Sequence, residues 1–227
     1  YLHCSLAVSD TTFVFYFVLI ITSNHLYDGD ALFIAVFWRE TMLCTVTGVV
    51  FMISILASNM STSLIAVDRF LGIVFQPFTK KGFSKWQVVL GICITWSTAI
   101  LLPTRASVLT SQHVTNSACV PIGRGSTTVV SSFYFTVNSL IFLCTCCAYS
   151  AIMAKLANRD SSLGNSSNSK TALVRLVLLL LSNAIVSFTI CTMVVFSLTQ
   201  INIPMTGKVH LSLLLFPLNA CLNPIIN

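Results

Sequence analysis

The stretch from Trp38 to Pro77, WRETMLCTVTGVVFMISILASNMSTSLIAVDRFLGIVFQP, decides the fold of this chain. Within it, residues 41–67 form a run of 27 residues without a charged side chain, and about 20 apolar residues suffice for a helix to cross a bilayer. Cys44 and Arg69 lie 25 residues apart, about 37 Å of helix at about 1.5 Å per residue. The stretch therefore predicts a membrane-spanning helix with a thiol near one membrane face and a charge pair near the other.

Small polar residues on this helix indicate that it is buried in a bundle. They recur at spacings of seven, four and three residues, which places them on one helix face. Small side chains on a shared face let neighbouring helices approach closely in a membrane. The alternative, a lipid-facing anchor helix, needs no such stripe. The stripe consists of Thr47, Ser54, Ser58 and Ser61.

The composition is that of a polytopic membrane protein. Hydrophobic residues make up 56% of the 227 residues and charged residues 8%, against about 25% charged residues in a soluble domain. The gaps between apolar runs are short, so we expect one domain over residues 1–227. Tyr1 begins inside an apolar run without a starting Met or a basic leader, and we expect the chain to be a fragment of a longer protein.

Six apolar runs, each bounded by charged residues or by Gly, Pro, Asn and Ser, predict an all-α membrane fold. Residues 156–171 are rich in Ser and Asn and poor in large apolar side chains, which predicts a mobile cytoplasmic loop. The predicted spans are residues 1–23, 41–72, 88–109, 128–154, 172–200 and 209–226.

The basic residues predict the orientation of the bundle. Eight of the 12 Lys and Arg residues fall on the side that holds Arg69, and short cytoplasmic loops retain Lys and Arg. We therefore place that side in the cytoplasm. The net charge of +6 then follows mostly from topology, and nucleic-acid binding is not expected. The basic residues on this side are Arg69, Lys80, Lys81, Lys85, Lys155, Arg159, Lys170 and Arg175.

The nine cysteines divide by environment. Cys44 and Cys119 both fall on the outer, oxidising side, which predicts a disulfide bond between them. For the run at 144–147 we weigh palmitoylation near a membrane face against packing within the span, and we favour packing. The cysteines inside apolar runs are expected to be packed thiols; they are Cys4, Cys93, Cys144, Cys146, Cys147, Cys191 and Cys221.

Six short motifs occur in order along the chain. They are SLAVSD at 5–10, Cys44 with Cys119, Asp68-Arg69-Phe70, Trp96, Tyr149, and Asn223-Pro224. Together they make the chain resemble a rhodopsin-like (class A) G-protein-coupled receptor. The resemblance implies a seven-transmembrane helix bundle in the cell membrane, of which six helices, the second to the seventh, are present.

A narrower resemblance is to the leucine-rich-repeat receptors, the glycoprotein-hormone and relaxin receptor group. It rests on YDGD at 27–30, WRETMLC at 38–44 and FPLNACLNP at 216–224. Receptors of that group carry a large extracellular hormone-binding domain. This chain departs from the usual pattern in five ways. Leu56 stands in place of Glu, Asn183 in place of Asp, and Asn227 in place of the Tyr that usually follows NPxx. In addition, no Pro interrupts residues 172–200, and Gln76 is a one-residue insertion before Pro77.

Asp10 lies within the first predicted span. A carboxylate in the hydrocarbon core costs on the order of several kcal/mol unless it is paired or hydrated, so we expect Asp10 to be functional. The resemblance implies that it lines a sodium and water pocket with Ser58, Asn219 and Asn223, and oxygen ligands suit a hard cation. In the alternative interpretation Asp10 is neutral and hydrogen-bonded to the same side chains as a packing feature.

The resemblance also implies a switch that couples the receptor to a G protein. Arg69 is expected to pair with Asp68 at rest and to meet a G protein when the sixth helix moves outward. The alternative is that Arg69 only anchors its helix at the membrane surface. The base of the predicted sixth helix, residues 167–175, offers Lys170 and Arg175 but no acid. The switch residues are Asp68, Arg69, Phe70, Tyr149, Asn223 and Pro224.

Two classes of function remain. Enzymes are disfavoured because the four His residues are scattered and no Gly-rich phosphate loop occurs. The favoured function is a receptor that transmits binding of an extracellular peptide or protein hormone to a heterotrimeric G protein, without a cofactor other than a sodium ion. The alternative is an ion-coupled transporter or pump that uses Asp10. It is disfavoured because proton relays are chains of ionisable groups, and Asp10 is alone at mid-membrane.

Overall fold

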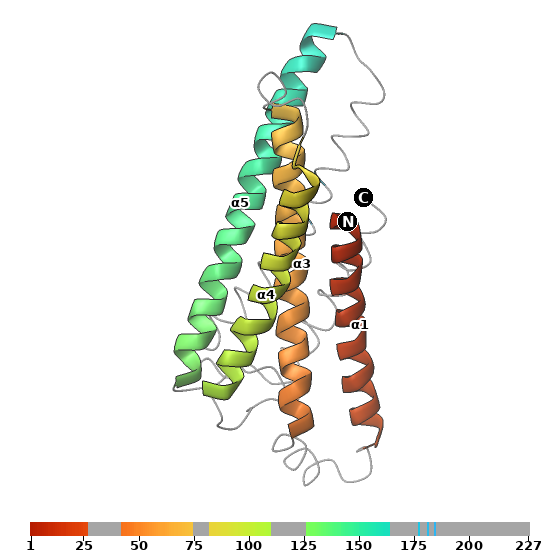
Figure 1. Cartoon of the computed structure of the whole chain (residues 1–227), viewed down its shortest axis with the longest axis vertical. Coiled ribbons are helices and arrows are strands. Elements are labelled where there is room, and N and C mark those ends of the chain that lie inside the picture. The colour runs from red at the N-terminus through yellow and green to blue at the C-terminus, as the bar shows by residue number, and fades with distance from the viewer. Residues whose placement is uncertain are drawn as a thin grey trace.

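The computed structural model of the protein describes residues 1–26, 42–74, 82–109 and 126–163, together with Val177, Leu181 and Ala184. These residues form four long helices, which lie alongside one another in a bundle (Figure 1). The described part of the chain contains no strand, which agrees with the predicted all-α class. The helices are α1 (Leu2–Leu26), α3 (Met42–Val74), α4 (Lys85–Leu109) and α5 (Ser126–Leu163).

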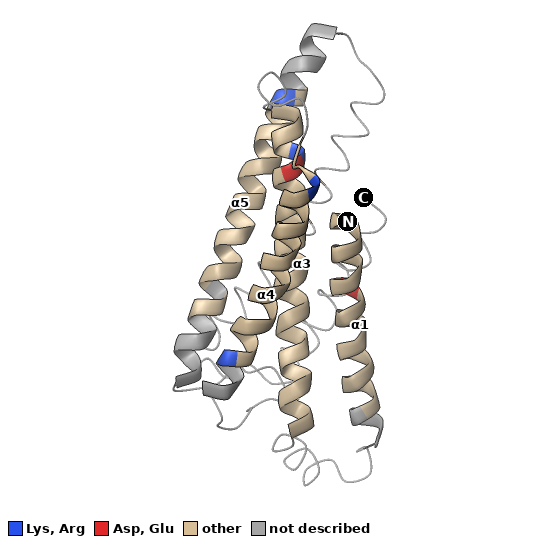
Figure 2. Ribbon diagram, in the orientation of Figure 1, with Lys and Arg blue, Asp and Glu red and all other residues tan. Residues whose placement is uncertain are grey.

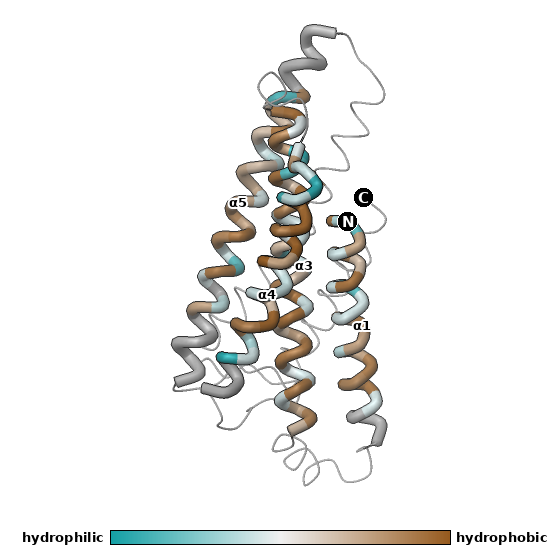
Figure 3. Tube along the Cα trace, in the orientation of Figure 1, coloured by the Kyte–Doolittle hydropathy of each residue, from teal (hydrophilic) through white to brown (hydrophobic). Residues whose placement is uncertain are grey.

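Each of the four helices contains a segment that is long and apolar enough to cross a membrane, and Figure 3 shows hydrophobic residues along all of them. These segments confirm four of the predicted spans. The predicted spans 172–200 and 209–226 fall outside the described residues except for the three helical positions named above, so the count of six helices stays a prediction. The four segments are Leu2–Thr22, Met42–Val74, Lys85–Arg105 and Thr136–Leu156.

Several helix ends differ from the predicted boundaries, and the sequence explains two of them. Helix α4 begins at Lys85 because Ser84 and Gln87 form a capping box: the Ser84 N–H donates to Gln87 Oε1 at 2.8 Å, and the Gln87 N–H donates to Ser84 Oγ at 3.4 Å. Helix α5 continues to Leu163, into the segment predicted as a loop. Residues 153–157 are Met, Ala, Lys, Leu and Ala, which all favour helix, so the helix does not end where the hydrophobic run ends.

Helix α3 is the central element, and it packs against α1, α4 and α5. Within an apolar 18-residue window of α3, 61% of the residues are buried, against 17% in the corresponding window of α4. The predicted polar stripe accounts for part of this burial, since Thr47, Ser54, Ser58 and Ser61 are all at most 6% exposed. The prediction of a buried helix is confirmed, and the lipid-facing alternative is wrong.

Aromatic and small apolar side chains fill the spaces around α3. Tyr16 of α1 and Phe51 of α3 have ring centroids 4.8 Å apart, and Phe13 joins the same group. Further along the bundle, the small residues Ala57 of α3 and Ala99 of α4 let these two helices approach closely. Because lipid tails are as apolar as these side chains, such contacts contribute through close packing rather than through exclusion of water.

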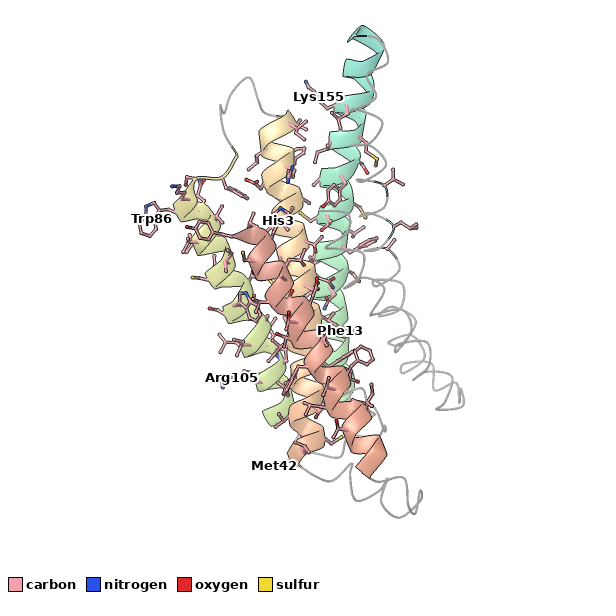
Figure 4. All side chains as sticks on the ribbon, turned by 90° about the vertical axis from the view of Figure 1, so that its right-hand side faces the viewer. His3, Phe13, Met42, Trp86, Arg105 and Lys155 are labelled. Atoms are coloured by element: carbon pink, nitrogen blue, oxygen red, sulfur yellow. The ribbon has the colours of Figure 1, made fainter. Side chains whose placement is uncertain are left out.

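The outward faces of α1, α4 and α5 carry large exposed hydrophobic residues, as expected for surfaces in contact with lipid. Figure 4 shows Lys155 and Trp86 toward one end of the bundle and Arg105 and Met42 toward the other. Figure 2 shows that charged residues are sparse along the four ribbons. The 21-residue α4 span between Lys85 and Arg105 corresponds to about 30 Å, the thickness of the hydrocarbon core.

The expectation of packed thiols is wrong for most cysteines of the described helices. Cys4, Cys93, Cys144 and Cys147 are exposed, and Cys146 is half-buried. All five are free thiols. A thiol behaves as a small hydrophobe, so a lipid-facing position satisfies it as well as a packed one, and an apolar sequence context cannot distinguish the two.

Candidate functional site

The intramembrane carboxylate lies at the contact between α1 and α3. Ser58 Oγ donates a hydrogen bond to Asp10 Oδ1 at 3.1 Å. Asp10 is partly buried, and Ser58 is 6% exposed. Two of the four residues predicted for the sodium pocket are therefore brought together, and their oxygens face one another. The other two, Asn219 and Asn223, lie outside the described residues.

A junction of three helices lies five residues before Asp10 on α1. Ser5 Oγ accepts a hydrogen bond from Trp96 Nε1 of α4 at 3.0 Å and lies 3.1 Å from Ser61 Oγ of α3. Ser5 is 7% exposed and Ser61 1%. One hydroxyl thus links α1, α3 and α4, and this link fixes the height of Asp10 relative to Ser58.

The Asp68-Arg69-Phe70 triplet lies near the end of α3 that is predicted to face the cytoplasm, and Arg69 is exposed. Asp68 Oδ1 accepts a hydrogen bond from the Phe83 N–H at 2.8 Å. Phe83 precedes α4, so Asp68 ties the end of α3 to the start of the next helix. Asp68 and Arg69, both among the described residues, do not form an ion pair with each other. The structure thus gives Asp68 a partner that the sequence did not predict, and the resting Asp68–Arg69 pair stays a prediction.

Gly82 makes this contact sterically feasible. A Cβ atom added at Gly82 would lie 2.6 Å from Asp68 Oδ1 and 3.3 Å from the Asp68 backbone oxygen. Real Cβ atoms essentially never come within 3.0 Å of another atom in this way. Any side chain at position 82 would therefore displace the carboxylate from Phe83.

Phe70 and Tyr149 belong to one apolar cluster next to Arg69, between α3 and α5. Tyr149 of α5 is 1% exposed and packs with Ala66 of α3 and with Ile152, and Phe70 packs against this group. The structure therefore brings together four of the predicted switch residues between α3 and α5, on the side predicted to face the cytoplasm. The remaining two, Asn223 and Pro224, are not among the residues that the structure describes.

Cys44 lies at the opposite end of α3, where it is fully buried and disulfide-bonded. The other described cysteines are all free thiols, so the partner is one of Cys119, Cys191 and Cys221, which lie outside the described part of the chain. Of these three, Cys119 is the one predicted at the outer face. Pairing of Cys44 with Cys119 stays a prediction.

A family profile described as "7 transmembrane receptor (rhodopsin family)" matches residues 1–226. The chain belongs to this family. The match establishes a multi-pass receptor of the cell membrane rather than an enzyme, and it does not favour the transporter alternative.

Similar curated proteins include relaxin receptor 2 from two mammals. The receptor of Canis lupus familiaris is 25% identical over 214 residues, which cover 88% of this chain and 29% of that protein. The receptor of Homo sapiens is 26% identical over 216 residues, which cover 88% of this chain and 28% of that protein. The chain thus spans less than a third of the length of these relatives. The similarity agrees with the narrower resemblance to the relaxin receptor group.

In this receptor two buried asparagines form a contact that sequence reasoning missed. Asn59 of α3 donates through Nδ2 to Asn138 Oδ1 of α5 at 2.9 Å. The two residues are 8% and 3% exposed. Each is a strongly polar amide inside a predicted span, and the argument applied to Asp10 would have identified them as candidates.

Proposed function

We propose that this receptor transmits binding of an extracellular peptide or protein hormone to a heterotrimeric G protein. The observation that carries the proposal is the exposed Arg69 at the cytoplasmic end of α3, beside Asp68 and above the cluster that holds Phe70 and Tyr149. A cation at this position is accessible to a protein that docks from the cytoplasm. The similarity to relaxin receptor 2 supports a hormone as the ligand.

On the outer side, the proposed disulfide between Cys44 and Cys119 holds the segment 110–125, between α4 and α5, over the mouth of the bundle. The buried, disulfide-bonded Cys44 supports this arrangement. The resemblance to the leucine-rich-repeat receptor group supports hormone capture by an extracellular domain, followed by contact with this segment. The ligand signal then reaches the cytoplasm through α3, which contacts all three other described helices.

Within the membrane, Asp10, Ser58, Asn219 and Asn223 are proposed to hold a sodium ion that favours the resting state. The hydrogen bond between Ser58 and Asp10 supports this proposal because it places two oxygen donors together beside the central helix. The pump alternative lacks such support. In the described spans, Asp10 is the only carboxylate away from a helix end, whereas a proton relay needs a chain of such groups.

The test is guanine-nucleotide exchange on a panel of purified heterotrimeric G proteins by the full-length receptor in lipid nanodiscs, with relaxin as the probe hormone. Arg69→Gln is expected to abolish both basal and relaxin-stimulated exchange. Lys155→Gln is the matched control, because it removes another exposed cation at the same end of the bundle and is expected to leave exchange unchanged. Absence of exchange by the unmodified receptor on every heterotrimer, or equal loss in both variants, would contradict the proposal.

A further inference from the structure

Three hydrogen bonds form a continuous polar seam between α3 and α5. Tyr134 Oη donates to the Met52 carbonyl of α3 at 2.9 Å. Asn138 Nδ2 donates to the Tyr134 carbonyl at 2.9 Å, and Asn138 Oδ1 accepts from Asn59 Nδ2 at 2.9 Å. The seam thus joins α5 to α3 at two levels, Met52 and Asn59, which lie about two helical turns apart.

This seam lies where water cannot replace it. Asn59 is 8% exposed and Asn138 3%, and both lie inside membrane-spanning segments. An amide that loses its partner there has no solvent to bond, so separation of the pair leaves two unsatisfied groups. Hydrogen bonds are also directional. The seam therefore fixes both the distance and the register of α5 on α3 at this height.

The cytoplasmic part of the same contact is built differently. It consists of Ala66, Ala148, Tyr149 and Ile152, with Phe70 packed against them. Among the described residues, no side-chain hydrogen bond joins α3 to α5 on the cytoplasmic side of Asn138. Thr145 is buried there, but its hydroxyl donates to the Ile141 carbonyl of its own helix at 2.9 Å. When apolar contacts of this kind shift, no polar group is left unsatisfied, so this part can tilt at a lower cost than the seam.

We propose that Asn59 and Asn138 are positioning residues that form a pivot for α5 during signalling. The outer part of α5 stays fixed on α3, and the cytoplasmic part, which carries Tyr149, tilts about the asparagine pair. The inference rests on the proposed function, because it concerns the movement that transmits the signal. It adds a residue pair and a fixed point to that movement.

The distance along α5 from Asn138 to Tyr149 is long enough for a small tilt to displace Tyr149. Tyr149 follows Asn138 by 11 residues, about 16 Å along the helix at about 1.5 Å per residue. A tilt of about 10° at the pivot moves Tyr149 by roughly 3 Å over that length. Such a displacement is sufficient to remove Tyr149 from its place against Ala66, near the end of α3 that carries Arg69.

Electron–electron distance measurements on the full-length receptor in nanodiscs test the pivot. Spin labels are introduced through genetically encoded amino acids, so that the free cysteines do not interfere. One label pair, at Gly72 and Lys155, reports the cytoplasmic side: a Cβ at Gly72 meets nothing within 4 Å, and Lys155 is exposed. The second pair, at Leu43 and Phe133, reports the outer side, where both residues are exposed. In the unmodified receptor we expect a narrow outer distribution and a broader cytoplasmic one; equal widths would overturn the pivot.

A double-mutant cycle tests whether the two asparagines act as a pair. Asn59→Leu and Asn138→Leu each leave one amide without its partner, and each is expected to raise the population of longer α3–α5 distances about three- to twentyfold. The double variant removes both amides and is expected to change that population by less than the product of the two single effects. Multiplicative effects would mean that the asparagines act independently, and would overturn the proposal.

The matched control combines Asn59→Leu with Thr145→Val, since Thr145 is buried on α5 but bonds its own helix. These two effects are expected to multiply. If a leucine variant does not reach the membrane, the same cycle is run with Asn59→Ser and Asn138→Ser. If the asparagine variants show coupled effects on the α3–α5 distances but the receptor catalyses no nucleotide exchange, the pivot is supported and G-protein coupling is contradicted. If the receptor catalyses exchange but the effects on the distances are not coupled, G-protein coupling is supported and the pivot is overturned.

Discussion

At the scale of single residues, the cytoplasmic end of this receptor depends on the absence of a side chain at position 82. The family resemblance implies that the Asp68 carboxylate pairs with Arg69. In the structure, however, Asp68 Oδ1 accepts a hydrogen bond from the Phe83 N–H at 2.8 Å. A hydrogen bond to a charged acceptor contributes about 1.5–3 kcal/mol when buried and less here, because Asp68 is only partly buried. Gly82 is what lets the two groups meet.

Gly82→Ala is therefore expected to destabilise the receptor, by about 1 kcal/mol, because the new Cβ would lie 2.6 Å from Asp68 Oδ1 and must displace it. The measurement is the thermal midpoint of purified receptor in detergent. Gly72→Ala is the control, since its Cβ meets nothing within 4 Å and the change favours helix by about 0.5–1 kcal/mol. A midpoint for Gly82→Ala equal to or above that of Gly72→Ala would show that the contact is unimportant.

A second prediction at this scale concerns the ion proposed beside Asp10. If sodium binds there and prefers the resting state, then raising sodium at constant ionic strength should lower basal nucleotide exchange. Asp10→Asn should remove this dependence because it removes the charge that attracts the cation. Ser54→Ala is the control. Ser54 is a buried serine one turn before Ser58 on α3, and its hydroxyl donates to the Phe51 carbonyl of its own helix. Sodium dependence that persists in Asp10→Asn would exclude this site.

At the scale of helices, the sequence predicts which face of a helix is buried, but it does not predict which residues of two helices meet. The stripe on α3 was predictable because its spacing alone defines a face. Which residue of α5 opposes Asn59 depends on the tilt and height of two helices, and no single-segment pattern contains that information. The start of α4 was encoded locally, in the Ser84 and Gln87 capping box, but a hydropathy pattern does not detect caps.

The proposed link between α3 and the segment 110–125 gives the prediction at this scale. Cys44→Ala should yield a receptor that reaches the surface poorly or fails to respond, because the segment loses its attachment to the bundle. Cys93→Ala is the control, since Cys93 is an exposed free thiol. Peptide mapping of non-reduced receptor identifies the partner directly. A disulfide between Cys44 and Cys191 or Cys221 in place of Cys119 would contradict the predicted pairing.

At the scale of the whole molecule, the orientation rests on the distribution of basic residues. Two N-x-S sequences make it testable, at Asn59 and at Asn165. Asn59 is buried in α3, and Asn165 follows α5 on the side assigned to the cytoplasm, so neither is expected to carry a glycan. Mass spectrometry of receptor from mammalian cells checks this. A glycan on Asn165 would invert the assigned topology.

The balance between resting and active states is also a property of the whole bundle. In many family members, as the resemblance implies, an acid at the base of the sixth helix pairs with the arginine that matches Arg69. A partly exposed pair of this kind contributes roughly 0.5–2 kcal/mol to the resting state. Here residues 167–175 supply Lys170 and Arg175 but no acid, and Asp68 bonds Phe83. Since about 1.4 kcal/mol corresponds to a tenfold change in the active fraction, we predict measurable ligand-independent signalling from the full-length receptor.

Ser169→Glu should lower this basal signalling. Position 169 lies outside the described residues and matches the position of the usual acid by sequence, so a carboxylate there would reach Arg69 only when the sixth helix is in its resting place. The measurement is basal nucleotide exchange at equal surface expression, with Ser169→Gln as the uncharged control. The expected order is lowest exchange for Ser169→Glu and equal, higher exchange for the other two. Equal exchange in all three would mean that other contacts hold the sixth helix, and the polar seam between α3 and α5 would then be the first candidate, because it restrains the neighbouring helix at two levels.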